Sequence, residues 1–178
     1  MTVSAERPPA VAAVARPARR LLEDEVDRKL AATLVADGRS TLKSLAEVTG
    51  LSVSAVQARV RRLEADGIIR GYTALLDSEA IGLPLAALIA ITPLDPAQPD
   101  DAPERLAGLP EIEACHSVAG EDSYVLFVRV ATPTALEQLI RQIRRRANVS
   151  TRTTVVLQTF FERRAAPWAQ AIDPLPPS

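Results

Sequence analysis

The stretch LSVSAVQARVRRLE, residues 51–64, carries three arginines and one acidic residue in a chain that is almost neutral. The 178 residues include 21 lysines and arginines against 22 acidic residues, which gives a formal charge of -1. Between Arg39 and Leu63, however, there are five basic residues and one acid. Such a local concentration of positive charge indicates a surface that meets a polyanion, and a basic helix of this kind fits duplex DNA.

The elements that must position these arginines are three short helices, which the apolar spacing predicts between residues 24 and 64. Asp24 is a suitable N-cap for the first helix, which runs to about residue 36. The second begins near Thr41 and stops before Gly50, and the third starts at the N-cap Ser52 and ends at Gly67. Two helices joined by a tight turn at a glycine are typical of a helix-turn-helix motif.

The third predicted helix has an apolar face and a hydrogen-bonding face. Its apolar residues recur at steps of three, four and three, so we expect Val53, Val56, Val60 and Leu63 to face the core. The residues then turned outward or to the flanks are small and polar at the start of the helix and basic at its end. The predicted DNA contacts on this helix and its cap are Ser52, Ser54, Ala55, Gln57, Ala58, Arg59, Arg61 and Arg62.

These residue types match the chemistry of a major groove. Gln57 can hydrogen-bond adenine, and the three arginines can reach guanine or phosphate. Ser52 and Ser54 suit a phosphate at a helix N-terminus. A solvated face of an ordinary helical bundle would have a similar composition, so the helix alone leaves that alternative open.

After Gly67 the sequence IIRGYTALLD, residues 68–77, predicts two short strands about Gly71. Such a wing would place Arg70 beside the DNA backbone, and Arg39 is a further candidate for phosphate contact. The sequence therefore predicts a winged helix-turn-helix domain over residues 23–72, followed by a linker strand over residues 73–84.

From residue 85 onward the pattern changes to alternating strands and helices. Strands are predicted over residues 85–94, 112–118 and 124–131, and the last strand carries alternating residues from Thr151 to Phe161 on one face. A short helix is expected over about residues 99–108, and a longer one is capped by Thr132 and opened by Pro133. The order βαββαβ is that of a ferredoxin-like sandwich, predicted over residues 85–163, so the fold class is α+β.

Composition and single residues exclude several classes of protein. The one cysteine, Cys115, cannot form an internal disulfide, which favours the cytoplasm. It adjoins the one histidine, His116, on a predicted strand, where neighbouring side chains point to opposite faces, so we expect no metal site. No apolar run is long enough for a bilayer. Proline-rich ends predict tails over residues 1–22 and 164–178.

Several phrases of the sequence resemble the leucine-responsive regulatory protein (Lrp/AsnC) family of the kind found in actinobacteria. They are EVDRKL, GRSTLKSLAEVTGLSVSAVQARVRRLEADGIIRGYTALLD, VAGEDSYVLFVRV and TRTTVVLQTF, and the resemblance covers nearly everything from Glu23 to Glu162. It implies a transcription regulator without catalytic residues or cofactor, whose C-terminal domains pair across their sheets into homodimers and stack into octamers on double-stranded DNA. It also implies an amino-acid effector, held between dimers near the hairpin loop after residue 118.

The residues of that loop fit an amino acid chemically. Gly120 permits close backbone approach, Glu121 and Asp122 can accept from an ammonium, Ser123 can bridge, and Tyr124 would wall the side-chain pocket. The family commonly has Gly-x-x-Asp-Tyr here, whereas this chain has Ser123 at the aspartate position. Which of the two acids substitutes for the aspartate stays open, and a glycine hairpin with solvated acids would look the same.

Assembly contacts and rival functions complete the expectations. Seven apolar residues are expected either in contacts between copies, in a dimer or a higher assembly, or equally in the plain core: Leu85, Ala87, Ile89, Ile91, Val125, Phe127 and Phe161.

Two other functions are compatible with such an architecture. A sensor or scaffold without DNA binding would not need the arginines of a capped helix. A siroheme decarboxylase-like enzyme would need basic or histidine groups around a large pocket, and the solitary His116 is poorly placed for that.

Overall fold

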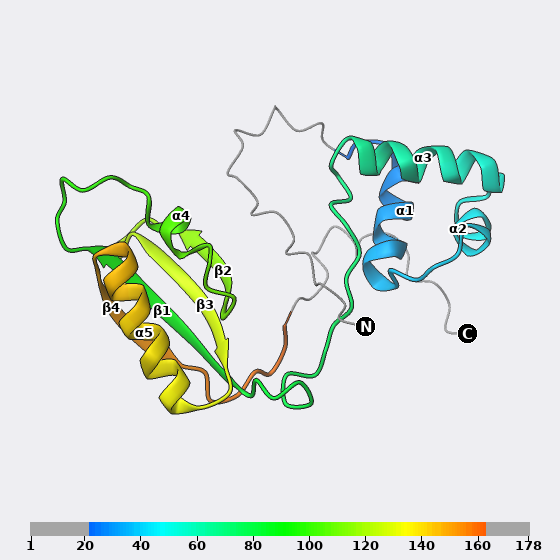
Figure 1. Ribbon diagram of the computed structural model, residues 1–178. Coiled ribbons are helices and arrows are strands. Elements are labelled where there is room, and N and C mark those ends of the chain that lie inside the picture. The colour runs from blue at the N-terminus through cyan, green and yellow to red at the C-terminus, as the bar shows by residue number, and fades with distance from the viewer. Residues whose placement is uncertain (1–21, 163–178) are drawn as a thin grey trace, which may run out of the picture. The chain divides into compact units, whose positions relative to one another are not determined.

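The computed structural model describes residues 22–162, so the predicted tails lie outside the described residues except for Leu22. Residues 22–75 and 76–160 belong to two separate compact units (Figure 1). The first contains three helices, and the second combines four strands with two helices. Among the described residues, no helix has both the length and the apolar character needed to span a bilayer.

The second unit is a four-stranded antiparallel sheet with helices on one face. Its strands are β1 Leu85–Pro93, β2 Ile112–Ser117, β3 Tyr124–Val130 and β4 Val149–Val155, arranged in the order β2-β3-β1-β4. Its helices are α4 Ala102–Leu106 and α5 Pro133–Ala147, which pack against each other. The predicted ferredoxin-like order βαββαβ is confirmed, and Thr132 caps α5 by accepting from the Ala135 N–H at 3.1 Å.

The core of this unit lies between the sheet and its two helices. Alternate residues of β1 and β3 point into it, together with the buried stripe of α5. These core residues include Ala87, Ile89, Ile91, Leu126, Val128, Leu139 and Ile143. Of the two alternatives expected for Ala87, Ile89 and Ile91, the structure therefore places them in the core of this unit. On the other face Leu88 pairs with Phe127 and Ala90 with Val125, all partly exposed.

Strand β4 is shorter than the alternating pattern predicted, because its partner strand runs out. Val155 lies opposite Ala87, and the Val156 N–H donates to the Ala86 carbonyl at 2.9 Å, next to the start of β1. Beyond that point the apolar residues are exposed: Leu157 is 96% and Phe161 65% accessible. The expectation of a strand reaching Phe161 was wrong.

The first unit confirms the three predicted helices: α1 Glu25–Ala36, α2 Leu42–Thr49 and α3 Val53–Ala65. The predicted caps Asp24 and Ser52 are present, and Thr41 caps α2 as well, since each accepts from the backbone N–H three residues further on. Gly50 adopts φ 70° between α2 and α3, which is the left-handed conformation that the turn requires.

The helices enclose a small apolar core formed by Leu30, Leu45, Val56 and Leu63. Val60 also lies in it, but Val53 does not. Val53 is the first residue of α3 and is 46% exposed. The expectation that Val53 faces the core was therefore wrong.

The predicted wing strands are absent between residues 68 and 77, and the linker to β1 contains no strand either. Gly67, at φ 66°, ends α3, and the N–H groups of Ile68 and Ile69 donate to the Leu63 carbonyl at 2.9 and 3.0 Å. Both isoleucines pack on the helical core. They complete the end of the helix instead of starting a ribbon, and an isolated two-stranded ribbon is only marginally stable.

One buried acid ties α1 to α3. Asp27 is 5% exposed, and its carboxylate accepts from Arg59 at 2.8 Å and also from Arg62. Arg59 donates at 3.0 Å to Asp24 as well. The Asp27 N–H, followed by Arg59, holds the pKa of Asp24 below its ordinary value, although desolvation opposes this shift. The arginines therefore carry part of the packing between the two helices.

We expect Asp27→Asn to lower the free energy of unfolding by about 2 kcal/mol, because hydrogen bonds to charged groups contribute about 1.5–3 kcal/mol. Urea denaturation measures this loss. Glu25→Gln is the matched control on the same helix, since Glu25 pairs at 3.3 Å with Lys29 but its side chain is 81% exposed. That variant is expected to lose less than about 0.5 kcal/mol. Equal losses in the two variants would contradict the role given to Asp27.

Candidate functional site

Helix α3 presents a short polar surface that no other described segment covers. Gln57, Ala58 and Arg61 are exposed, and Gln57 and Arg61 lie four residues apart on one side of the helix. Neither side chain has a hydrogen-bond or ion-pair partner among the described residues. An amide and a guanidinium are thus available to an external acceptor, as the sequence predicted.

The start of α3 offers hydroxyl groups. Ser52 and Ser54 are exposed, and their hydroxyl oxygens lie 3.1 Å apart. Ser52 also accepts from the Ala55 N–H at 3.3 Å, so its hydroxyl caps the helix while staying accessible. Ala55 itself is half-buried. The small side chains here leave room for a bulky partner next to the first turn.

Arg59 and Arg62 lie in a different environment from Arg61. Both were expected to reach DNA, but their guanidinium groups bind the carboxylate of Asp27. Arg59 is the more committed, with a side chain 29% exposed against 48% for Arg62. Hydrogen bonds to Asp27, opposed by desolvation, also raise the pKa of Arg59 above its ordinary value. Arg61 is left as the arginine of α3 without a counter-charge among the described residues.

Sequence reasoning missed Asp27, although a signal was present. Asp27 occupies the same helical stripe as Leu30, Ala31 and Leu34, which means that an acid stands where the spacing calls for an apolar residue. An acid on a buried stripe must find a positive partner.

The two other predicted DNA contacts, Arg39 and Arg70, are both exposed. Arg39 precedes α2, and Arg70 follows α3 in the segment without strands.

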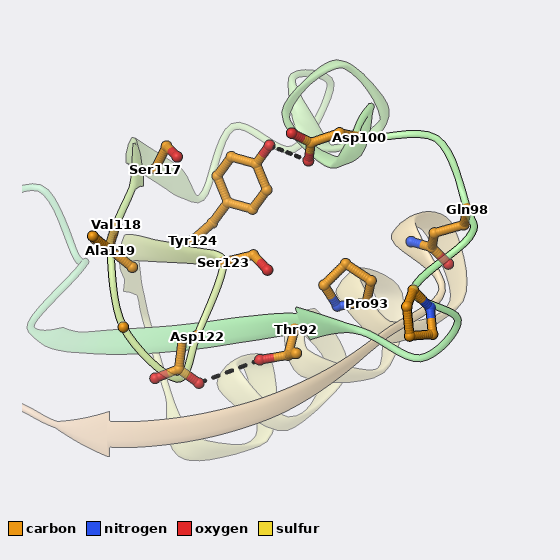
Figure 2. A pocket seen from close by; sticks show the side chains of 12 residues that line it. Thr92, Pro93, Gln98, Asp100, Ser117, Val118, Ala119, Asp122, Ser123 and Tyr124 are labelled. Atoms are coloured by element: carbon orange, nitrogen blue, oxygen red, sulfur yellow. Dashed lines mark hydrogen bonds between the residues drawn. The ribbon is translucent and has the colours of Figure 1, made fainter.

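The second candidate site is a cavity of about 580 Å³ at one end of the sheet (Figure 2). Its walls come from the end of β1, the loop before α4, and the hairpin between β2 and β3. Its lining residues are Thr92, Pro93, Pro96, Gln98, Asp100, Ser117, Val118, Ala119, Gly120, Asp122, Ser123 and Tyr124. Four of the five predicted loop residues line it, and Glu121 does not.

Asp122 and Glu121 differ in position. Asp122 lines the cavity, where its carboxylate accepts from the Thr92 hydroxyl at 3.4 Å and from the Arg152 guanidinium. Glu121 is exposed and outside the lining. Of the two acids that the sequence left open, Asp122 is the one placed to meet a molecule in the cavity.

The backbone of the hairpin supplies donors. The Ser123 N–H donates to the Ile91 carbonyl at 3.0 Å, and the Val118 N–H donates to the Ser123 carbonyl at 3.1 Å. The N–H groups of residues 119–122 donate to no described backbone or side-chain acceptor. An added Cβ on Gly120 would meet no atom within 4 Å, so no close approach within this chain explains the glycine. Free amides of this kind can bind a carboxylate.

Tyr124 forms a buried wall of the cavity. It is 7% exposed, and its hydroxyl donates to the Asp100 carboxylate (Figure 2). This hydrogen bond, helped by desolvation, raises the pKa of Tyr124 to about 12. Asp100 and Gln98 were missed at the sequence level because their loop is distant in sequence from the hairpin. Gln98 is held at the end of α5, where it donates at 3.1 Å to the Ala147 carbonyl.

The raised pKa of Tyr124 can be measured directly, because the chain has two tyrosines. In Tyr72→Phe, tyrosinate absorbance reports Tyr124 alone, and we expect its midpoint near pH 12. Because the folded pKa exceeds the unfolded value of about 10, the stabilising contribution is complete below about pH 10 and is lost as the pH rises toward 12. Adding Asp100→Asn should move the midpoint down. A midpoint near 10 in both variants would show that the bond to Asp100 is absent.

Each of the two units matches a known protein family. Residues 23–70 match a winged helix-turn-helix DNA-binding family, and residues 86–166 match the Lrp/AsnC ligand-binding domain. The two matches cover most of the chain in the same order as the two units.

Individual relatives agree with these matches. The HTH-type transcriptional regulator LrpA of Mycobacterium tuberculosis is 59% identical over 79% of this chain and 94% of its own length. The leucine-responsive regulatory protein of Escherichia coli is 36% identical over 80% of this chain and 88% of its own length.

Among solved structures, a feast or famine regulatory protein from Mycobacterium tuberculosis complexed with L-methionine is 58% identical. The match has a TM-score of 0.79 and covers 80% of this chain and 97% of that one. With both domain families, their order and close relatives in agreement, the chain belongs to the Lrp/AsnC family of DNA-binding transcriptional regulators.

Proposed function

We propose that this regulator binds specific DNA sequences through α3 and that a small amino acid modulates its DNA binding or assembly. The effector would bind between dimers, near the hairpin of residues 120–124. The observation that carries the first part is the uncovered pair Gln57 and Arg61 on a capped helix. Gln57 would read a base edge, preferably adenine, and Arg61 would contact guanine or phosphate.

The cavity supports the second part through its chemistry. An amino acid carries an ammonium and a carboxylate, and both need partners once they leave water. Asp122 offers the acceptor and the free amides of residues 119–122 offer donors. The complex of a relative with L-methionine is consistent with a ligand of this class.

Assembly connects the two parts. A single small reader binds weakly, whereas two readers on a dimer reach half-sites about one helical turn apart and gain apparent affinity. We propose that the sheet face with Leu88, Ala90, Val125 and Phe127 meets a second copy, and that dimers stack into octamers in the cytoplasm. An effector acts on DNA binding only through different affinities for two assemblies, typically a coupling of about 1–3 kcal/mol.

The DNA contacts are tested by titrating operator and random duplexes at several salt concentrations. Arg61→Ala is expected to weaken binding to both duplexes and to reduce the salt slope by about 1 for each phosphate that Arg61 neutralises. Gln57→Ala is expected to reduce the difference in affinity between the operator duplex and the random duplex. Arg105→Ala serves as the control. It removes an exposed arginine of the second unit, paired there with Asp101, and should change neither the affinity for the two duplexes nor the salt slope. Unchanged binding in both α3 variants would overturn the proposal.

The effector contacts are tested by thermal unfolding with each of the twenty amino acids, beginning with L-methionine. A bound ligand raises the melting temperature by mass action. Asp122→Asn should remove this rise, because the ammonium loses its charged acceptor. Its pair with Arg152 is 67% exposed on the arginine side and contributes little stability, so the fold should persist. Glu121→Gln, one residue away but outside the cavity, is the matched control and should keep the rise. The opposite pattern would assign the role to Glu121.

A further inference from the structure

Helix α5 carries a second concentration of positive charge that the proposed function does not use. Its inner stripe, with Leu136, Leu139 and Ile143, is buried against the sheet. Its outer surface includes a shallow depression of about 470 Å³. The residues lining it, which we name the arginine face, are Gln138, Arg141, Gln142, Arg144 and Arg145.

The arginine face stands out from the unit around it. Residues 85–160 contain seven arginines and no lysine, against nine acidic residues, so this part of the chain is negative. Four of those seven arginines nevertheless fall between Arg141 and Arg146. No acidic or apolar side chain lines the depression. The charge of the unit is thus separated, with its positive part on one helix.

Within the described residues, little neutralises this charge. Arg141 pairs with Glu137 at 3.2 Å, but both side chains are largely exposed, at 60% and 65%, and such surface pairs are weak. Arg144 donates through Nε to the neutral Thr151 hydroxyl at 2.8 Å, which orients the guanidinium and leaves its charge uncompensated. Arg145 has no hydrogen-bond or ion-pair partner among the described residues.

We propose that the arginine face binds the sugar-phosphate backbone of the duplex, outside the bases read by α3. Arginine and glutamine donors without an apolar centre suit phosphate oxygens, to which about half to two-thirds of protein–DNA hydrogen bonds are made. Contacts between two copies of a chain are on average more apolar and contain aromatic residues at their centre, and this face has no apolar or aromatic side chain in its lining. The inference rests on the proposed function, because that function supplies the duplex. The contact is independent of base sequence and strengthens the hold on long DNA.

The test compares two duplexes carrying the same operator. One is about 20–25 base pairs long, enough for two half-sites, and the other has long flanks. Arg141→Gln, Arg144→Gln and Arg145→Gln are combined in one variant, and the matched control replaces the same three residues with lysine, which keeps the charge. All three positions are exposed, so the helix should fold in both variants, and circular dichroism verifies this.

On the long duplex we expect the glutamine variant to bind at least tenfold more weakly, with a salt slope smaller by about 2–3 for each protomer that touches the DNA. The glutamine variant should bind the short duplex with the same affinity as the unchanged protein. The lysine variant should retain most of the salt slope on the long duplex. If the glutamine variant keeps the long-duplex slope while Arg61→Ala loses operator binding, the inference is overturned and the proposed function stands. An unchanged slope with a lower mass by light scattering would make this face a contact between copies instead. If Arg61→Ala also leaves binding unchanged, the proposed function itself fails.

Discussion

The ion pairs of Asp27 decide which side chains of α3 remain open to a partner. A buried carboxylate needs a positive partner, and Asp27 takes two of the three arginines of α3 for this purpose. Those arginines fix the helix on the body of the domain, whereas Gln57 and Arg61 have no partner for their side chains among the described residues. A helix that looks uniformly basic in sequence thus separates into a side that holds the fold and a side that is open to a partner.

The second unit follows from a sheet that is covered on one face. Helices α4 and α5 bury the residues of β1 and β3 that point toward them, while Leu88 and Phe127 pair on the opposite side and stay partly exposed. Burial of an apolar sheet surface of this kind lowers the free energy, which supports the proposed contact with a second copy. The same one-sided arrangement leaves the outer side of α5 free to carry its arginines.

The cavity depends on three segments that meet at the end of β1. The hairpin brings Asp122 and its free amides, and the loop before α4 brings Asp100, which holds the Tyr124 hydroxyl. Both carboxylates in the lining are already engaged, Asp122 by Thr92 and Arg152, and Asp100 by Tyr124. The exposed pair with Arg152 is the easier to exchange for a ligand, because surface pairs contribute little.

The sequence by itself determined the features that depend on neighbouring residues. Caps at Asp24, Thr41, Ser52 and Thr132 start helices where predicted, and the apolar periods give the order of strands and helices, because both signals act within a few residues. Only the tertiary structure decided that Asp27 holds Arg59 and Arg62, 32 and 35 residues away, and that the Asp100 loop closes the cavity beside the hairpin. It also ended β4 at Val155 and left the wing without strands, since a strand continues only where a partner backbone lies beside it. Contacts between distant segments depend on how the elements pack, and residue spacing can show that a buried acid needs a partner but not which distant residue supplies it.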